Sequence, residues 1–304
     1  MRSLRSLVLG GSGMLGRQVV AEGRRRGHPT LGLSRVAADV TELEGLLAWG
    51  REFRPEVVFN CAAMTAVDAC EGEEERAFAI NAGGAANAAA LARAAGARLF
   101  QLSTDYVFDG SAGEPYPEDA PTGPRSAYGR SKLAGEAAAL AGGEARDGAG
   151  GGAAAGPTIV RTSWLFGPGG PSFVATMLRL MAEGTDPLRV VDDQVGCPTY
   201  TPHLARALWD LAEIGPAGGA AGVVHYRNRE PVSWYGFACE IAASRRPAVA
   251  VEPISTAESA RPAPRPAYSV LAVERFERLT GRPVESWRAG LGHYLDTIRG
   301  VRNA

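Results

Sequence analysis

Short apolar segments alternate with longer segments of helical spacing along this chain, and this alternation limits the folds that the chain can adopt. Segments of strand length at residues 4–9, 30–33, 56–63, 98–103 and 158–161 are separated by helix-like segments at residues 14–27, 41–53, 73–95 and 128–141. In parallel sheets each such helix carries the chain back to the same end of the sheet. We therefore predict an α/β fold, a doubly wound parallel sheet with helices on both faces. Thr41 and Glu44 have the spacing of a capping box before the second helix.

Three glycines lie where the first predicted strand meets the first predicted helix. Gly10, Gly13 and Gly16 form a GxxGxxG pattern that follows the strand and opens the helix. Glycine lets the backbone turn tightly and approach a pyrophosphate, and the N-terminus of a helix attracts an anion. The pattern favours nucleotide binding over a purely structural turn. The loop residues expected at the cofactor are Gly10, Gly13, Met14, Leu15 and Gly16.

Arg35 follows the second predicted strand, where a Rossmann fold contacts the adenosine ribose of a dinucleotide. An acidic residue there would prefer a free 2′-hydroxyl, whereas an arginine can accept a 2′-phosphate. Asp39 and Val40 come shortly afterwards and are placed to flank the adenine. These residues predict NADPH as the cofactor, with NADH as the second choice. The alternative interpretation of Arg35 is an arginine in a solvated loop.

Tyr128 and Lys132 are one turn apart and share one face of a predicted helix. Lys132 is the only lysine among 32 basic residues, and it follows a strand that runs into Ser103, Thr104 and Asp105. An ammonium group near a phenol lowers the pKa of the phenol and makes it a usable proton donor or acceptor. We therefore predict a catalytic group of Thr104, Tyr128 and Lys132, in which Lys132 also binds a ribose hydroxyl of the cofactor. The alternative is an exposed tyrosine and lysine on a helix surface.

The chain is predicted to divide into two parts. Residues 1–161 carry the alternation and form the predicted NAD(P)-binding domain of Rossmann type. Within them, residues 142–156 are rich in glycine, which is typical of a flexible surface insertion. In residues 162–304 short helices alternate with turns rich in proline and glycine. We expect this part to form a smaller, mainly substrate-binding lobe over the carboxyl ends of the strands, with some segments returning to the Rossmann core.

Composition and charge exclude several classes of function. The 304 residues carry a net charge of −1, so no general positive field is present to bind nucleic acid or an anionic membrane. No apolar run approaches the roughly 18 residues that a membrane span needs, and the N-terminus lacks a signal-peptide pattern. The four cysteines and four histidines are scattered. Their positions predict reduced thiols in a cytoplasmic protein and no metal site.

Together these residues resemble the extended short-chain dehydrogenase/reductase superfamily, and further motifs narrow the resemblance to the dTDP-4-dehydrorhamnose reductase family. The motifs read NCAAMTAVD at residues 60–68, STDYVFDG at 103–110, YGRSKLAGE at 128–136, RTSWLFG at 161–167, VVDDQVGCPT at 190–199 and PAPRPAYSVL at 262–271. They occur in family order and cover both predicted parts of the chain. No single motif is specific for this family, but the complete set in this order is.

The resemblance implies NAD(P)H-dependent reduction of the C4 ketone of a dTDP-4-keto-6-deoxy-L-sugar, with dTDP-4-dehydro-L-rhamnose as the expected substrate. It places Ala62 and Ala63 at the cofactor beside Tyr128 and Lys132. The residues implied around the sugar nucleotide are Thr65, Val67, Thr104, Asp105, Trp164, Gln194, Tyr200 and Arg265, of which Arg265 is expected to pair with the diphosphate. Met64 and Tyr268 stand where the family usually has Tyr and Asn, which leaves the exact sugar open.

Several alternatives remain open on the sequence alone. A related reductase or synthase of an antibiotic pathway, for example one that makes dTDP-dihydrostreptose, would share these motifs. A non-catalytic regulatory subunit of the methionine adenosyltransferase type has the same fold, but an intact Tyr128–Lys132 pair favours catalysis. A related epimerase or 4,6-dehydratase shares the tyrosine and lysine; dehydratases usually have Asp-Glu after the active-site threonine, where this chain has Asp105 and Tyr106. The resemblance also allows a homodimer and Mg²⁺ at its interface, although the sequence shows no acidic cluster for the metal.

Overall fold

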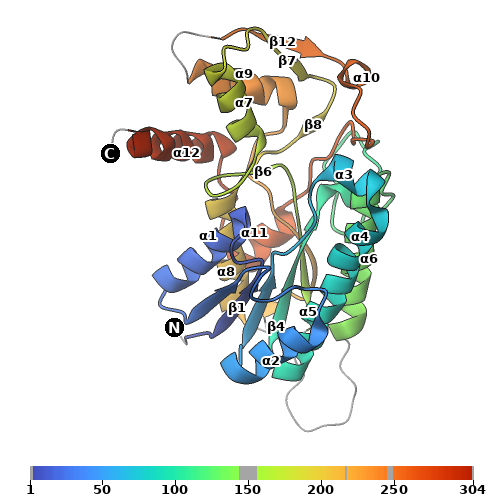
Figure 1. Cartoon of the computed structure of the whole chain (residues 1–304), viewed down its shortest axis with the longest axis vertical. Helices are drawn as coiled ribbons and strands as arrows, with labels where there is room; N and C mark the ends of the chain where they lie inside the picture. Colours follow the sequence, from blue (N-terminus) through green and yellow to red (C-terminus); the bar gives the residue numbers. More distant parts are fainter. Residues whose placement is uncertain (1–2, 144–155, 216–217, 245–248, 303–304) are drawn as a thin grey trace.

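The centre of the molecule is a six-stranded, fully parallel sheet in the order β10–β5–β4–β3–β1–β2 (Figure 1). The structure is a computed structural model that describes residues 3–143, 156–215, 218–244 and 249–302, so residues 144–155 of the predicted insertion lie outside it. The strands are β1 (Ser6–Leu9), β2 (Thr30–Leu33), β3 (Val57–Asn60), β4 (Arg98–Thr104), β5 (Thr158–Thr162) and β10 (Gly222–His225). The predicted α/β class and doubly wound sheet of Rossmann type are confirmed.

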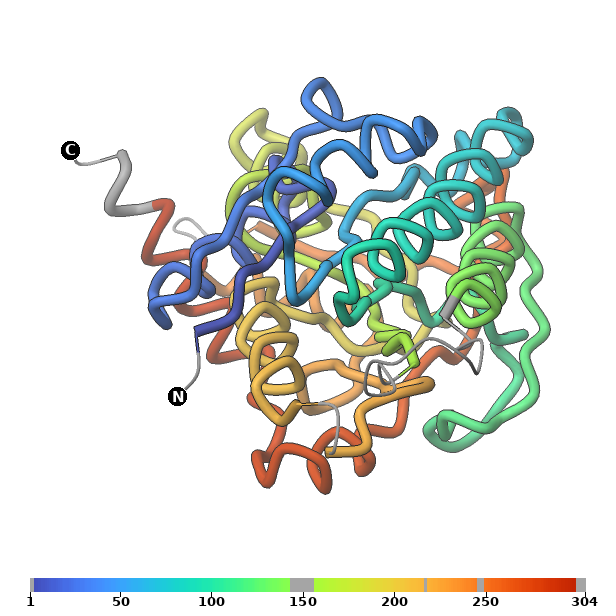
Figure 2. The backbone as a smooth tube through the Cα atoms, turned by 90° about the horizontal axis from the view of Figure 1, so that it is seen from below, coloured from blue at the N-terminus to red at the C-terminus, as the bar shows by residue number. Residues whose placement is uncertain are grey.

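Helices cover both faces of this sheet. The helices α1 (Met14–Arg25), α8 (Thr201–Ile214) and α11 (Glu274–Thr280) share one apolar core, and α2 (Leu43–Phe53), α5 (Gly84–Ala95) and α6 (Ala127–Gly143) share the other. Figure 2 shows α5 and α6 side by side, on the opposite side of the sheet from α8. Along β1, Val8 packs into the first core while Leu7 and Leu9 pack into the second. Successive side chains of a strand point to opposite faces of the sheet. A strand that is apolar almost throughout can therefore pack into the cores on both faces.

The helix predicted at residues 73–95 is interrupted by a π-helical turn. After α3 (Val67–Gly72), the chain forms α4 (Glu74–Phe78), a π-helix at Ala79–Gly83 and then α5. Asn81 in the π-helix is buried; its amide accepts from the backbone N–H of Met64 at 2.9 Å and donates to the Ser131 hydroxyl at 2.9 Å. Such bulges often mark functional regions. Here the bulge fixes the segment after β3 against helix α6.

The capping box predicted at Thr41 and Glu44 is wrong. Helix α2 begins at Leu43 after Glu42, which makes no side-chain capping hydrogen bond. The hydroxyl and backbone N–H of Thr41 instead donate to the Asp39 carboxylate, at 2.8 and 3.0 Å. An aspartate two residues earlier in the chain thus competes successfully for the groups that a capping box would use.

The remaining elements form a smaller lobe above the carboxyl ends of the strands (Figure 1). Its larger elements are α7 (Phe173–Ala182), β7 (Leu188–Val191), α9 (Trp234–Ala243), β12 (Val251–Ile254), α10 (Thr256–Ser259) and α12 (Trp287–Arg302), and its short strands are β6 (Leu165–Phe166), β8 (Val195–Gly196), β9 (Thr199–Tyr200) and β11 (Val232–Ser233). The lobe has its own apolar core, which contains Phe166, Phe237 and Trp287. Within the described ranges, no helix combines the length and apolar character that crossing a membrane requires.

Candidate active site

The loop between β1 and α1 has the shape of an anion cradle. Gly10 has a φ of +70°, and a Cβ at this position would lie 2.8 Å from the backbone nitrogen of Ala62, in the loop after β3. A Cβ on Gly16 would collide with the carbonyl oxygen of Gly10. Gly13 is exposed, has a φ of −73° and precedes α1 without a side-chain cap. The first-turn N–H groups, which belong to Met14, Leu15 and Gly16, are therefore available to an anion.

The strand order puts this loop at the switch point of the sheet. β1 has β2 on one side and β3 on the other, so the chain winds away from β1 in both directions. In open α/β sheets, ligands bind in the crevice outside such a point. Ala62 and Ala63, which follow β3, lie at the same edge as Gly10. The residues expected at the cofactor from the first and third strands are therefore brought together.

The residues after β2 include a partly exposed ion pair and a buried side chain. Arg35 Nε lies 3.3 Å from the Asp39 carboxylate, and the Arg35 side chain is 70% exposed. Hydrogen bonds from Thr41, together with Arg35, keep the pKa of Asp39 below its usual range. Val40 is buried in the core and contacts Gly84 at the start of α5. Arg35 and Asp39 therefore form one polar cluster, whereas the side chain of Val40 packs between the sheet and α5.

Strand β4 and helix α6 bring the predicted catalytic residues together. The Tyr128 hydroxyl is hydrogen-bonded to Thr104, the last residue of β4. Lys132 Nζ donates a hydrogen bond of 2.6 Å to the carbonyl oxygen of Leu102 in the same strand. Tyr128 and Lys132 are 9% and 4% exposed. The interpretation of the pair as an exposed tyrosine and lysine on a helix surface is therefore wrong.

Burial dominates the electrostatics of this group. It raises the pKa of Tyr128 above its usual value, and the hydrogen bond with Thr104 offsets part of that rise. Burial also lowers the pKa of Lys132 to about 8, against the opposing influence of the Glu136 carboxylate. The expectation that Lys132 lowers the pKa of Tyr128 is thus not met, because desolvation of the phenol dominates and the group that lowers the pKa is Thr104. Tyr128 is protonated at neutral pH, which suits a proton donor.

Beside Lys132 lies a buried ion pair that the sequence analysis missed. Arg161 in β5 donates to both oxygens of Glu136 in α6, at 2.8 and 2.7 Å, and the two side chains are 5% and 3% exposed. The Ser103 hydroxyl also donates to Glu136. A charged residue in the middle of the apolar strand Thr158–Thr162 is the feature that could have pointed to this pair, since buried charges need partners.

Two predicted substrate residues lie next to the catalytic group. Asp105, 1% exposed, accepts a hydrogen bond of 3.0 Å from Thr104 through one carboxylate oxygen, while the other has no hydrogen-bond partner among the described residues. Burial raises the pKa of Asp105 to about 6, and the nearby Ser269 hydroxyl opposes this. Val67, at the start of α3, packs with Tyr128. Thr65 is exposed in the preceding loop.

Arg265 is already paired within the protein. Its guanidinium donates to the two oxygens of Asp68 in α3, at 2.8 and 3.0 Å. Asp68 also accepts from the backbone N–H of Ala263 and lies 3.5 Å from Arg261. Asp68 was not among the residues predicted from the sequence, although it lies in the motif at residues 60–68. The pair connects the Rossmann part of the chain to the segment at residues 262–271.

Trp164, Gln194 and Tyr200 have different surroundings in the smaller lobe. Trp164 follows β5 and is half-buried, with its indole stacked on Trp234. The Gln194 side chain is buried and donates to the Thr256 hydroxyl at 2.8 Å. Tyr200 is 6% exposed and packs against Phe166 in the lobe core. The structure therefore does not bring the Tyr200 ring to the other predicted substrate residues.

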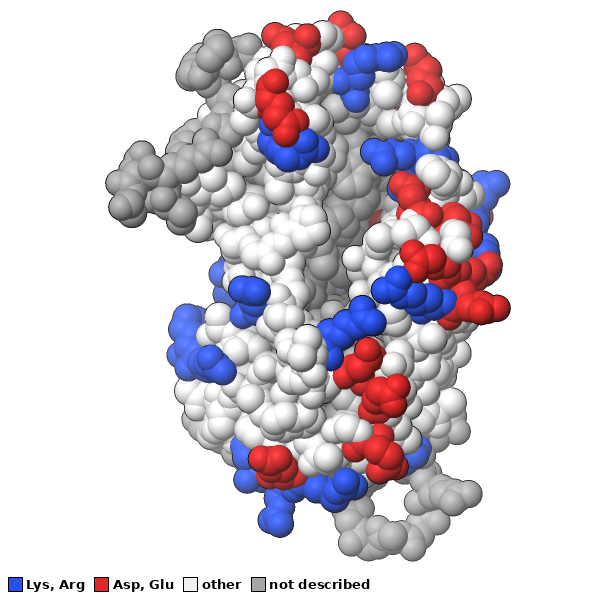
Figure 3. Space-filling view, in the orientation of Figure 1, with Lys and Arg blue, Asp and Glu red and all other residues white. Residues whose placement is uncertain are grey.

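The two departures from the family pattern also lie near the site. Met64 packs in the same apolar cluster as Tyr128. Tyr268 bridges to Val195, and the next residue, Ser269, is the neighbour of Asp105. Figure 3 shows this face of the molecule hollowed between the two lobes, with uncharged atoms along much of the walls and charged side chains along one rim.

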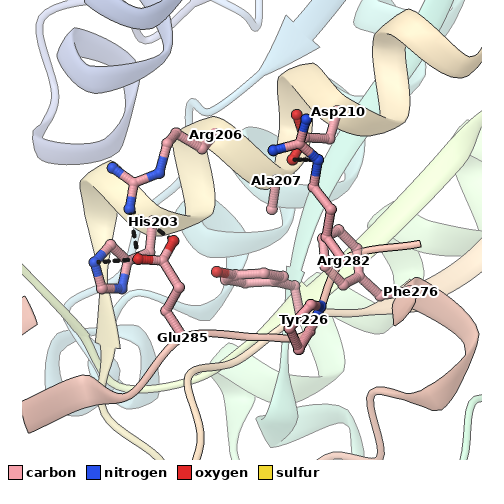
Figure 4. A pocket seen from close by; sticks show the side chains of 9 residues that line it. His203, Arg206, Ala207, Asp210, Tyr226, Phe276, Arg282 and Glu285 are labelled. Carbon is pink, nitrogen blue, oxygen red and sulfur yellow. Dashed lines mark hydrogen bonds and ion pairs between the residues drawn. The ribbon is translucent and has the colours of Figure 1, made fainter. Parts of the chain in front are cut away.

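A separate cavity of about 280 Å³ lies between α8 and the chain around α11 (Figure 4). It is lined by His203, Arg206, Ala207, Asp210, Tyr226, Phe276, Arg282, Pro283 and Glu285, and by none of the predicted site residues. Its charges compensate one another, because Arg206 pairs with Glu285 at 2.7 Å and Arg282 lies 3.6 Å from Asp210. In the part of the chain that the structure describes, no three His, Cys, Asp or Glu residues form a group that could bind a metal ion.

Comparisons with known proteins agree with this geometry. A family model described as the RmlD substrate binding domain matches residues 4–299. A dTDP-4-dehydrorhamnose reductase of Streptomyces griseus is 46% identical, over 97% of this chain and 94% of the relative. A Streptomyces antibioticus protein named as a probable dTDP-4,6-dihydroxy-2-methyloxan-3-one 4-ketoreductase is 40% identical, over 95% and 93%. The crystal structure of dTDP-4-dehydrorhamnose reductase from Bacillus anthracis in complex with NADP is 34% identical, covers 97% and 100% of the two chains and has a TM-score of 0.87. The resemblance predicted from the motifs is confirmed.

Proposed function

Because the chain belongs to the RmlD substrate binding domain family of dTDP-4-dehydrorhamnose reductases, we propose that it reduces the C4 ketone of dTDP-4-dehydro-L-rhamnose to dTDP-L-rhamnose with NADPH. The observation that carries this proposal is the buried group of Thr104, Tyr128 and Lys132 at the edge of the sheet that also carries the glycine loop. An intact proton donor beside a dinucleotide cradle favours a reductase over a non-catalytic regulatory subunit.

The cradle fits the proposed cofactor. The uncapped first turn of α1 offers N–H groups to the pyrophosphate, and exposed Gly13 leaves the space that a side chain would fill. Arg35, whose side chain is largely exposed, would bind the 2′-phosphate of NADPH, and Asp39, Ala62 and Ala63 would contribute to the rest of the cofactor site. NADPH, when bound, supplies the hydride.

The protein's own residues orient the ketone and deliver the proton. Tyr128, protonated at neutral pH, donates its hydroxyl proton to the developing C4 alkoxide. Thr104 donates its one hydroxyl proton to Asp105 in the structure and would turn it to the carbonyl oxygen of the bound ketone, which restrains the ketone against Tyr128. Lys132, fixed by its bond to Leu102, binds the nicotinamide ribose through its remaining N–H groups and places positive charge close to the site.

The sugar nucleotide is proposed to occupy the hollow between the lobes. Asp105 and Gln194 offer polar groups, and Trp164, Val67 and Thr65 line the sugar. Arg265 pairs with the diphosphate through donors that Asp68 leaves free. Tyr200 packs in the core of the smaller lobe and does not contact the substrate. The free cysteines Cys61, Cys70, Cys197 and Cys239 fit a reducing compartment, the cytoplasm.

The experiment that tests the proposal is incubation with enzymatically prepared dTDP-4-dehydro-L-rhamnose and NADPH, with product analysis by NMR. We expect dTDP-L-rhamnose and an equimolar loss of NADPH. Tyr128→Phe, which removes one oxygen atom, is the matched control and should form little product. The 4-keto-6-deoxy-D-glucose nucleotide, offered in parallel, tests the configuration of the sugar. Exclusive turnover of that sugar, or no turnover of either, would reject the proposed substrate.

A further inference from the structure

Trp164 has an unusual backbone at a functional position. Its φ is +46°, a left-handed conformation that bulky side chains rarely adopt and that persists only where the surroundings enforce it. Thr162, two residues earlier, is paired with Thr104 across β4 and β5. Trp164 therefore lies only two residues beyond the neighbour of Thr104, the proposed catalytic threonine.

Two residues from other elements enforce the orientation of this indole. Trp234, the first residue of α9, stacks on Trp164 with ring centroids 3.4 Å apart and an angle of 6° between the planes. Phe173, the first residue of α7, packs against Trp234 with a centroid distance of 4.6 Å. Gly196 in β8 approaches the same indole so closely that a Cβ there would lie 2.5 Å from Trp164 Cε2. The Trp164 ring is thus confined by a flat aromatic neighbour and by a residue without a side chain.

The indole nitrogen of Trp164 has no hydrogen-bond partner among the described residues, although Gly196 lies against it: a Cβ there would be 2.7 Å from Nε1. Trp49, Trp209 and Trp287 each donate a hydrogen bond from the indole nitrogen to a backbone carbonyl. Trp164 is half-buried, and its indole nitrogen donates to no other described residue. An aromatic ring with one available N–H suits a ligand that presents both an apolar patch and hydroxyl groups, such as a 6-deoxysugar.

We propose that Trp234 and Gly196 are positioning residues for the sugar nucleotide, and that they act by fixing the indole of Trp164 against the deoxysugar. This inference rests on the proposed function, because it assigns Trp164 to the sugar. Trp234 sets the plane of the ring by stacking, and Gly196 leaves the room that the ring occupies. Neither residue contacts the substrate, so both affect binding only through Trp164.

The test is steady-state kinetics of Trp234→Leu and Gly196→Ala with dTDP-4-dehydro-L-rhamnose. We expect KM for the sugar nucleotide to rise about tenfold while kcat changes by no more than about twofold, since binding is affected more than the chemical step. The dissociation constant of NADPH should be unchanged. Trp234→Phe, which retains a ring for stacking, should recover most of the affinity. Tyr235→Leu removes a half-buried ring from the next position of α9 and serves as the control for damage to the helix.

A double-mutant cycle separates positioning from a general structural role. In a Trp164→Leu background, Trp234→Leu and Gly196→Ala should raise KM no further, because the residue through which they act is gone. Additive effects in that background would overturn the proposal, as would a wild-type KM in both single variants. Circular dichroism gives a second readout: the coupled indole signal expected from the Trp164–Trp234 stack should disappear in Trp234→Leu and change in Gly196→Ala. If the wild-type protein does not reduce the sugar nucleotide, the proposed function fails; if it does and the variants keep its KM, only this inference fails.

Discussion

Asp68 accepts two hydrogen bonds from the guanidinium of Arg265, at 2.8 and 3.0 Å, across 197 positions of sequence. The pair joins α3 of the Rossmann part to the segment that completes the smaller lobe. An arginine restrained in this way loses less freedom when it binds a second anion. In the proposed site, Asp68 therefore orients Arg265 for the diphosphate instead of competing with it.

Asp68→Asn should raise KM for the sugar nucleotide about tenfold and leave the dissociation constant of NADPH unchanged. A tenfold change corresponds to about 1.4 kcal/mol, close to the lower end of the about 1.5–3 kcal/mol that a hydrogen bond to a charged group contributes. Steady-state kinetics measure the first quantity and fluorescence titration the second. Glu73→Gln, which alters an exposed ion pair with Arg76, is the control. A lower KM in Asp68→Asn would mean that Asp68 competes with the substrate.

The glycines of the first loop should respond differently to substitution. Gly13 is exposed and has a backbone conformation open to any residue, so Gly13→Val should keep the fold but block approach of the pyrophosphate. We expect loss of NADPH binding with a melting temperature within a few degrees of wild type. Gly16→Ala should instead lower the melting temperature, because its Cβ would collide with the Gly10 carbonyl. NADPH titration and thermal unfolding distinguish the two outcomes, and normal NADPH affinity in Gly13→Val would remove the loop from the cofactor site.

Arg35→Ala should lower the preference for NADPH. The Arg35 side chain is largely exposed and pairs only loosely with Asp39, so its loss should not affect folding. A charge-assisted hydrogen bond contributes about 1.5–3 kcal/mol, so the ratio of kcat/KM for NADPH to that for NADH should fall about tenfold or more. Arg51→Ala, a change of another exposed arginine, provides the comparison. An unchanged ratio in Arg35→Ala would exclude the 2′-phosphate role.

Turnover should fall as the pH rises through about 8. The pKa of Lys132 is lowered to about 8, so its ammonium group is present below that pH and lost above it. Glu136 favours the charged lysine; Glu136→Gln should therefore move this limb of the pH–rate profile to lower pH. The same substitution leaves buried Arg161 without its partner and should cost about 3–5 kcal/mol of stability. If kcat of the wild-type enzyme stays constant up to pH 9, turnover does not depend on the charge of Lys132 and this prediction is wrong.

The parts of the site carried by local patterns were predictable from the sequence. The GxxGxxG loop and the Tyr128–Lys132 spacing each depend on residues within one loop or one helical turn. The alternation of apolar segments also predicted the parallel sheet, because a strand buried on both faces is apolar throughout. The only lysine of the chain, Lys132, was predicted to lie at the site, and the structure shows it to be buried.

Residues whose roles depend on distant partners were not predictable. Asp68 needs Arg265, Glu136 needs Arg161 and Trp164 needs Trp234, and no periodicity links these positions. Tyr200 was expected at the substrate because its ring offers an apolar face, but the same property packs it into the lobe core. The pKa of Tyr128 was misjudged for a related reason. The spacing places Lys132 one helical turn away, whereas the desolvation that dominates the pKa of Tyr128 appears only when the chain is folded.

The turnover number of Tyr128→Phe decides whether Tyr128 is the proton donor of the reduction. This variant keeps the ring, its packing and the bond between Lys132 and Leu102, and it removes only the hydroxyl that we propose as the proton donor. General acid catalysis contributes about 10²–10⁴-fold, so kcat with dTDP-4-dehydro-L-rhamnose and NADPH should fall by that factor while the dissociation constant of NADPH changes less than about twofold. Wild-type turnover by Tyr128→Phe would contradict the account.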